Sequence, residues 1–311
     1  MNAFLWLLIL SAGMVFGSVL AGLLPLTTKL SENQLRYLNI FGAGMLLGTA
    51  LVVIIPEGVE TYYDALQISA TDNEEEAKDH HHVGIGLALL LGFALMSVID
   101  NMFSLHGHAR PSSSSTLEYN ELSTVPDQDD TPDNQSHPFG QVHNGIKPRT
   151  TSSAATVAPV IGLMVHAMAD GIALGASASQ PQLSVLIFLA IMMHKAPAAF
   201  SLVMMLLYEG VARTQVKLQL FLFAIQAPVG AILTFLVLHL IPSVQLDRIG
   251  FWTGLLLIFS GGTFLFVAMH ALQQANYDHQ RGSAQKLTTV QLLTLLTGMV
   301  VPFILSLTHS H

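Results

Sequence analysis

Four ionisable residues inside two apolar stretches are the first feature of this sequence that could do chemistry. The stretch "HAMADGIALGAS" begins at His166 and places Asp170 four residues later, and "IMMHKAPAAF" contains His194 followed by Lys195. Residues four apart share a helical face, so His166 and Asp170 point the same way. Two imidazoles and a carboxylate match a borderline cation such as Zn²⁺, with water completing a tetrahedron. The alternative is structural, because a buried histidine can bond across helices and an aspartate can pair with a lysine.

The composition places these residues in a membrane protein. Of the 311 residues, 51% are apolar and only 10% are charged, and the mean hydropathy is +0.55. Such values are typical of integral membrane proteins, so we expect a lipid bilayer as the surroundings and no nucleic-acid partner. The chain has no cysteine, so any metal must be held by histidine, carboxylate or backbone oxygen. The net charge of −8 comes mostly from two acidic loops.

Eight apolar segments are long enough to cross a bilayer, which takes about 20 residues of helix. All eight should be helices, because unpaired backbone groups in lipid are prohibitive. The expected fold is therefore an all-α, polytopic membrane protein that forms a single domain over residues 1–311. The first segment lacks the basic start of a cleaved signal peptide, so we expect it to be retained. The segments are Phe4–Leu26, Leu38–Ile55, Val83–Phe103, Ala154–Ala178, Leu183–Tyr208, Leu218–Ile241, Gly250–Leu272 and Leu287–Leu307.

The basic residues predict the orientation of the chain. With eight crossings, nine Lys and Arg residues fall on one side of the membrane, and only Lys78 and Arg248 fall on the other. Positive charge concentrates on the cytosolic side, so both termini should face the exterior or a lumen.

Two polar segments separate the early helices. Residues 57–82 are expected to form an acidic lumenal loop that either captures divalent metal weakly or is a solvated linker. Residues 104–153 are rich in Ser, Pro, Asp and Asn and should form a disordered cytosolic loop. The candidate peripheral ligands are His80, His81 and His82 in the first segment, and His106, His108, His137 and His143 in the second.

The course of the fourth and fifth helices brings the two histidines to a similar depth. The fourth helix runs outward, which places His166 roughly 18 Å above the inner boundary. The fifth runs back and places His194 roughly 16 Å below the outer one. In a core about 30 Å thick, both lie near the midplane. Gly171 and Gly175 form a GxxxG pattern that should let these two helices approach closely.

Three further charged residues could serve the path of a cation. A lysine in lipid needs an anion, and Asp170 is the nearest plausible partner of Lys195. Adjacent helical residues diverge by about 100°, so Lys195 should flank the centre and not share the direction of His194. Glu57, at the outer end of the second helix, could gather cations, and Asp100, near the inner end of the third, could receive them. Either could instead cap its helix.

These features together resemble the ZIP (Zrt/Irt-like) family of metal transporters. The resemblance rests on "HAMADG" in the fourth of eight helices, "HKAPAA" in the fifth, outward termini and a long histidine-bearing cytosolic loop. The stretches "GTALVVIIPEGVE" and "FSGGTFLFVA" and the ending "THSH" narrow it to one member of the mammalian set. It implies a pseudosymmetric three-two-three arrangement. Helices one, four, five and six would then move as a bundle against two, three, seven and eight.

The chain departs from the family pattern at the groups that look like ligands of a second metal position. In this chain those positions hold Ala167, Lys195, Ala198 and Ala227. The resemblance therefore implies one transport site, in which the Lys195 ammonium takes the space and charge of a second cation. Its ligands would be His166, Asp170 and His194.

The resemblance implies transport of divalent metal, above all Zn²⁺, into the cytosol from the exterior or a secretory lumen. Zn²⁺ would be the substrate, alternating access around the midplane site the mechanism, and no organic cofactor would be needed. It also implies the trans-Golgi network, the secretory pathway and the plasma membrane as locations, and it allows a homodimer.

Two other classes of function are open. The same resemblance implies a steroid receptor of androgen type, coupled to G proteins. An intramembrane zinc hydrolase would also use His and Asp ligands, but the HExxH kind needs a glutamate beside its histidine. Lys195 takes that place, so we expect no enzyme.

Overall fold

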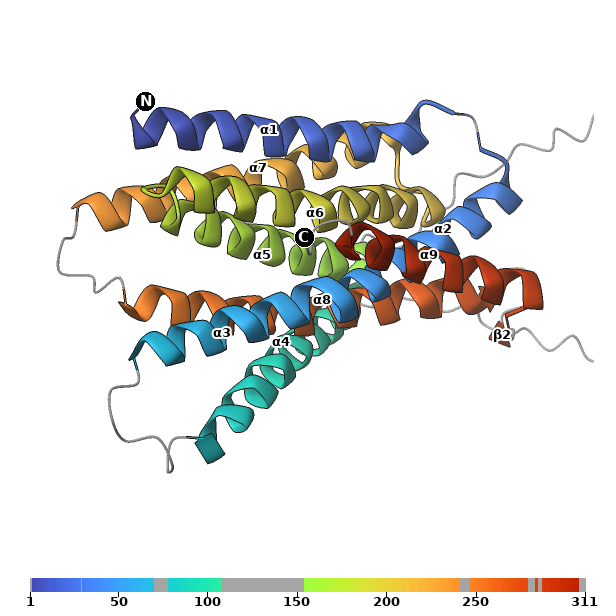
Figure 1. The fold of residues 1–311 in the computed structure, drawn as a ribbon. Helices are drawn as coiled ribbons and strands as arrows, with labels where there is room; N and C mark the ends of the chain where they lie inside the picture. Colours follow the sequence, from blue (N-terminus) through green and yellow to red (C-terminus); the bar gives the residue numbers. More distant parts are fainter. Residues whose placement is uncertain are drawn as a thin grey trace, which may run out of the picture.

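Long apolar runs must satisfy their own backbone hydrogen bonds in lipid, and the computed structural model shows that they do so as helices (Figure 1). The described residues are 2–28, 30–69, 78–107, 154–240, 247–278, 283–284 and 287–307. Among them, eight helical spans are long and apolar enough to cross a membrane. The predicted all-α class and the eight crossings are therefore confirmed.

The helices follow the predicted segments in chain order. They are α1 (Ala3–Leu23), α2 (Glu32–Thr49), α3 (Ile55–Ser69), α4 (Lys78–Gly107), α5 (Ala154–Ala176), α6 (Pro181–Tyr208), α7 (Arg213–Leu240), α8 (Asp247–Asn276) and α9 (Thr289–Leu307). A 3₁₀ turn, η1 (Leu24–Leu26), follows α1, and a π-helical turn, η2 (Ala50–Ile54), joins α2 to α3. Beyond α8, the short strands β1 (Tyr277–Asp278) and β2 (Ser283–Ala284) pair antiparallel.

The second span is longer than predicted. α2, η2 and α3 follow one another without a gap and form one rod from Glu32 to Ser69 (Figure 1), whereas the sequence predicts a helix over 38–55. A capping box fixes the start of the rod, because Ser31 and Gln34 exchange hydrogen bonds between side chain and backbone. The rod continues past Pro56 because a local π-helical adjustment, here the turn η2 just before it, can accommodate a proline inside a membrane helix.

Two segments that the sequence predicts as loops are partly helical. Of residues 57–82, those up to Ser69 belong to α3 and those from Lys78 belong to α4, so the loop boundaries are wrong. α4 also continues to Gly107, inside the segment 104–153. The error arises because hydropathy marks the lipid-facing part of a helix and not its ends. Residues 70–77 and 108–153, and with them the predicted disorder, lie outside the described residues.

The helices pack in two groups that meet at α5 and α6. One group is α1, α5, α6 and α7. The other is built on the α2–α3 rod, which packs against α8 and α9, while α4 packs on α8 (Figure 1). α5 contacts α7 within its own group and α4 and α8 across the boundary, and α6 contacts α2. Both histidine-bearing helices therefore lie where the groups meet.

Close packing of α5 depends on small residues at one crossing. A Cβ atom on Gly171 would overlap the backbone oxygen of Ala227, and one on Gly175 would overlap that of Ala231. The predicted partner of this GxxxG pattern, α6, is therefore wrong, because both glycines face α7. Gly171 follows Asp170, and adjacent residues diverge by about 100°, which turns the glycine stripe away from the charged face.

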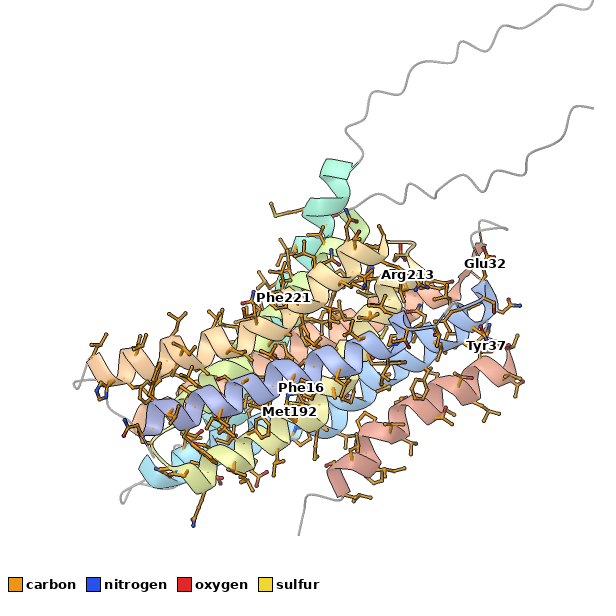
Figure 2. All side chains as sticks on the ribbon, turned by 90° about the horizontal axis from the view of Figure 1, so that it is seen from above. Phe16, Glu32, Tyr37, Met192, Arg213 and Phe221 are labelled. Carbon is orange, nitrogen blue, oxygen red and sulfur yellow. The ribbon has the colours of Figure 1, made fainter. Side chains whose placement is uncertain are left out.

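The outward faces of the bundle carry large apolar side chains (Figure 2). Phe16 of α1 is 70% exposed and Phe221 of α7 is 50% exposed, as surfaces that meet lipid tails should be. At one end of the bundle, Arg213 donates hydrogen bonds to the carbonyl oxygens of Leu26 at 3.0 Å and Thr28 at 3.1 Å. These bonds tie the start of α7 to the α1–α2 connection. That end is the one predicted to face the cytosol.

We expect Gly171→Ala to lower the thermal stability of the purified protein, because the new methyl group must push α7 away from α5. Overpacking of this kind typically costs about 1–3 kcal/mol. Gly86→Ala on α4 is the matched control, since a Cβ there meets nothing within 4 Å. Size-exclusion chromatography after heating in detergent gives the unfolding midpoint of both variants. An unchanged or higher midpoint for Gly171→Ala would contradict the packing argument.

Candidate metal centre

A short hairpin between α5 and α6 places their charged residues side by side. α6 begins at Pro181, whose missing N–H is tolerated at the first position of a helix. Ser184 closes the connection by donating to the carbonyl oxygen of Ser177 at 2.6 Å. Counted from the hairpin at about 1.5 Å per residue, His166 and His194 lie at similar depths, roughly 15 and 20 Å.

The carboxylate of Asp170 is the middle of this cluster. Its Oδ1 lies 3.4 Å from Nε2 of His194, within hydrogen-bond distance, and its Oδ2 lies 3.6 Å from Nε2 of His166. All three side chains are at most 1% exposed. Their ligand atoms lie within 4.8 Å of one another, and the two imidazole rings are 5.3 Å apart. The structure thus brings together the three residues that spacing and depth select.

The cluster has the atom types and the spacing that a divalent cation needs. Zinc–nitrogen and zinc–oxygen bonds are about 2.0–2.2 Å long, so tetrahedral ligands lie about 3.3–3.5 Å apart. Small side-chain movements would bring the three groups to that spacing. Nε2 of His166 and Oδ2 of Asp170 have no hydrogen-bond partner among the described residues. Buried polar atoms without hydrogen bonds are costly, so both atoms are available to a ligand, although Oδ2 also has a longer ion-pair contact with Lys195.

The ammonium group of Lys195 flanks the cluster. Its Nζ lies 3.8 Å from Oδ2 of Asp170 and 4.8 Å from the centroid of the Phe223 ring on α7. Lys195 is fully buried, and the aromatic face adds attraction to that of the carboxylate. The predicted ion pair is confirmed. His194 contacts the other carboxylate oxygen, so the two neighbouring side chains approach Asp170 from different directions.

Glu57 lies closer to this centre than the sequence predicts. The predicted position, at the outer end of a helix, is wrong because α3 continues to Ser69. Its Oε2 lies 4.0 Å from Nδ1 of His194, and its side chain is 29% exposed. The π turn η2 just before it holds an extra residue, which rotates the following side chains relative to a regular helix. Hydropathy gives no sign of such a turn.

Two residues of α8 that spacing alone does not select complete the surroundings of His166. The hydroxyl oxygen of Ser260 lies within hydrogen-bond distance of Nδ1, and the ring of Phe264 meets the imidazole edge to face at 4.7 Å. Both side chains are fully buried. Both belong to the stretch "FSGGTFLFVA". The sequence feature that could have identified them is a hydroxyl residue one helical turn before an aromatic residue in an otherwise apolar helix.

The other candidate residues lie apart from the cluster. Asp100 is half-buried on α4, and the group of ligands that the described residues form does not include it. His82 is exposed, and its Nδ1 lies 3.2 Å from the hydroxyl oxygen of Tyr63. Outside the described side chains lie those of His80, His81, His106, His108, His137 and His143.

Comparison with known proteins covers the whole chain. A family model described as ZIP zinc transporter matches residues 4–306. Zinc transporter ZIP9 of Micropogonias undulatus is 35% identical over 345 residues, with 100% of both chains covered. Zinc transporter ZIP9-A of Xenopus laevis is 35% identical over 338 residues, again with 100% of both covered. Zinc transporter ZIP9 of Macaca fascicularis is 40% identical over 159 residues, which cover 49% of this chain and 67% of the relative. These matches confirm the resemblance to the ZIP family and the prediction that the chain is similar to one particular member of its mammalian set.

We expect Lys195→Met to destabilise the metal-free protein, because it leaves the carboxylate of Asp170 buried without its cation. Removal of one partner of a buried pair typically costs about 3–5 kcal/mol. Asp170→Asn in the same chain should recover part of this loss, since no uncompensated charge then remains. A double-mutant cycle of unfolding midpoints, measured in detergent with a chelator, gives the coupling. Strictly additive effects would mean that the contact at 3.8 Å contributes nothing.

Proposed function

Because this chain belongs to the ZIP zinc transporter family, we propose that it carries Zn²⁺ across a membrane at the centre formed by His166, Asp170 and His194. The chain is a multi-pass membrane protein. Its family and its relatives are transporters and not enzymes. Zn²⁺ is therefore treated as the substrate.

One observation supports this centre above all others. Three buried ligand atoms of the kinds that Zn²⁺ prefers lie within 4.8 Å of one another. The carboxylate supplies negative charge, and the two imidazoles favour a borderline cation over Ca²⁺ or Mg²⁺, which prefer all-oxygen sites. Both histidines come from helices at the boundary of the two groups, where a displacement changes their surroundings.

Glu57 receives the cation on its way to the centre. It is the partly exposed neighbour of the cluster, and its Oε2 faces Nδ1 of His194 at 4.0 Å. A carboxylate there attracts cations, and a single carboxylate holds them weakly enough for onward transfer. Asp100 on α4 is the corresponding candidate for the release side. Weak capture by the peripheral histidines would precede or follow these steps.

The division of the helices supports alternating access. The three ligands belong to α5 and α6, whereas Glu57 belongs to α3 in the other group. A displacement of one group against the other therefore carries the centre away from Glu57. We propose that this displacement opens the centre toward the cytosol, so that zinc moves inward from the exterior or from a secretory lumen.

Lys195 restricts the centre to one cation. A second ion would have to share Oδ2 of Asp170, which already lies 3.8 Å from the ammonium group. Apart from Lys195 itself, the positions that look like the family's second set of ligands offer no side-chain donor here. They hold Ala167, Ala198 and Ala227, all fully buried.

Location and assembly follow from the resemblance alone. We place the transporter in the trans-Golgi network, the secretory pathway and the plasma membrane. The resemblance is also compatible with a homodimer. The steroid-receptor alternative, with its G-protein partner, is not favoured, because the matched relatives are named as zinc transporters. The hydrolase alternative is excluded by membership of a transporter family.

We expect His166→Ala, His194→Ala and Asp170→Asn each to abolish zinc uptake, because each removes one of three ligands. Radiolabelled zinc uptake by proteoliposomes, and bound zinc per purified chain, measure the effect at equal amounts of inserted protein. His239→Ala is the matched control, since this histidine lies at the end of α7 and stacks on Phe235. Normal uptake by any of the three variants would exclude the centre as the transport site.

Glu57→Gln should raise the zinc concentration for half-maximal uptake by about tenfold or more, because a local negative charge concentrates cations. The maximal rate should change little, since the three ligands remain. Glu60→Gln is the control, as it removes an exposed carboxylate from the next turn of α3. A lower maximal rate at unchanged half-saturation would contradict the role of Glu57 in cation approach.

A further inference from the structure

A second conclusion, which rests on the proposed transport function, concerns α8. We propose that Ser260 is a positioning residue: its hydroxyl accepts the Nδ1–H of His166 and so presents the Nε2 lone pair to the cation.

The two nitrogens of His166 have different surroundings. Nδ1 contacts the hydroxyl of Ser260, while Nε2 faces Oδ2 of Asp170 at 3.6 Å and has no hydrogen-bond partner among the described residues. A neutral imidazole carries one N–H and one lone pair. Metal-binding histidines usually give the remaining N–H to an acceptor, which fixes both the tautomer and the ring orientation. The contact with Ser260 therefore selects Nε2 as the ligand atom.

Phe264 restrains the same imidazole from a second direction. It lies one helical turn beyond Ser260, and its ring meets that of His166 at 4.7 Å and 63°. A ring held both at a nitrogen and by a neighbouring aromatic ring cannot swing away from Asp170 without breaking both contacts. One face of α8 thus fixes the orientation of one ligand.

The two glycines between these residues let α8 come close enough. A Cβ on Gly261 would meet the side chain of Ile55 in the α2–α3 rod, and one on Gly262 would overlap the backbone oxygen of Leu89 on α4. Successive residues of α8 therefore face different helices: Ser260 faces α5, Gly261 faces the α2–α3 rod and Gly262 faces α4. Ser260 reaches α5 because the two glycines allow the tight packing on the other sides.

The two histidines are held differently. Nδ1 of His194 has no hydrogen-bond partner among the described residues and lies 4.0 Å from Glu57, whereas Nδ1 of His166 is engaged. Ser260 belongs to the group of helices that does not carry the ligands. Displacement of α5 from α8 therefore removes the positioning contact, and zinc affinity should fall in that arrangement.

The test compares zinc affinity in full-length protein carrying Ser260→Ala, Ser260→Thr or Ser18→Ala. Loss of such a partner typically weakens metal binding by about 10–100-fold, which is the result expected for Ser260→Ala. Ser260→Thr keeps a hydroxyl and should stay within about threefold of the wild type. Ser18→Ala is the matched control, because Ser18 is fully buried in α1 and bonds only to the carbonyl oxygen of Met14 in the bonds described. Competition with a zinc-selective dye in detergent gives the dissociation constants.

A second measurement separates positioning from a general loss of structure. In metal-free protein with ¹⁵N-labelled histidine, the resonances that disappear in His166→Gln but remain in His194→Gln belong to His166. They should report a protonated Nδ1 in the wild type and in Ser260→Thr, and an altered pattern in Ser260→Ala.

The outcomes distinguish this inference from the proposed function beneath it. If His166→Ala leaves zinc affinity unchanged, the proposed centre is wrong and the role of Ser260 falls with it. If His166→Ala abolishes binding while Ser260→Ala keeps wild-type affinity and wild-type nitrogen shifts, the centre stands and the positioning role is overturned.

Discussion

The buried negative charge of Asp170 is the constraint on which the arrangement of the helices depends. A carboxylate away from water is tolerable only with opposite charge and polar contacts around it. Two imidazoles and one ammonium group approach its two oxygens at 3.4–3.8 Å, all from α5 and α6. Three further helices contact these partners of Asp170. Phe223 on α7 lies against Lys195, Ser260 on α8 contacts His166, and Glu57 on α3 faces His194. Side chains of five helices therefore meet around one charge.

Such convergence is possible because the helices carry small residues where they cross. Lipid tails are as apolar as leucine, so helices in a membrane gain stability from close backbone packing and not from escape from water. Gly171 brings α5 onto α7, and Gly262 brings α8 onto α4. On the far side, Gly44 and Gly48 of α2 contact the backbone of α9 in the same way. The glycine crossings therefore allow the close packing that brings the polar side chains of the centre together.

The parts of the structure that the sequence predicts are those that local physics decides. Hydropathy and backbone hydrogen bonding predict the eight helices. The four-residue spacing of His166 and Asp170, together with the similar depth of His194, predicts that the three residues meet. What fails is the choice of neighbour. Hydropathy reports the surroundings of a residue and not the helix it faces, so the contact of Gly171 with α7 was not predicted correctly. The approach of Glu57 depends on a π turn, and the contact of Ser260 depends on tertiary packing. Neither leaves a periodic signal.

The charges of the centre connect the proposed transport with the division of the helices. With Asp170 ionised, Lys195 protonated and both imidazoles neutral, the empty centre carries no net charge. Bound Zn²⁺ adds two positive charges, which lipid disfavours unless further anions lie nearby. In the proposed mechanism, Glu57 supplies one, and Ser260 holds His166 in the orientation that binds. Both belong to the helices that do not carry the ligands. A displacement of α5 and α6 therefore removes both supports for the cation together, while the pair of Asp170 and Lys195 travels with them and keeps the emptied centre neutral on its return. In the proposed mechanism, binding in this arrangement and release in the other therefore both depend on this one separation of the helices.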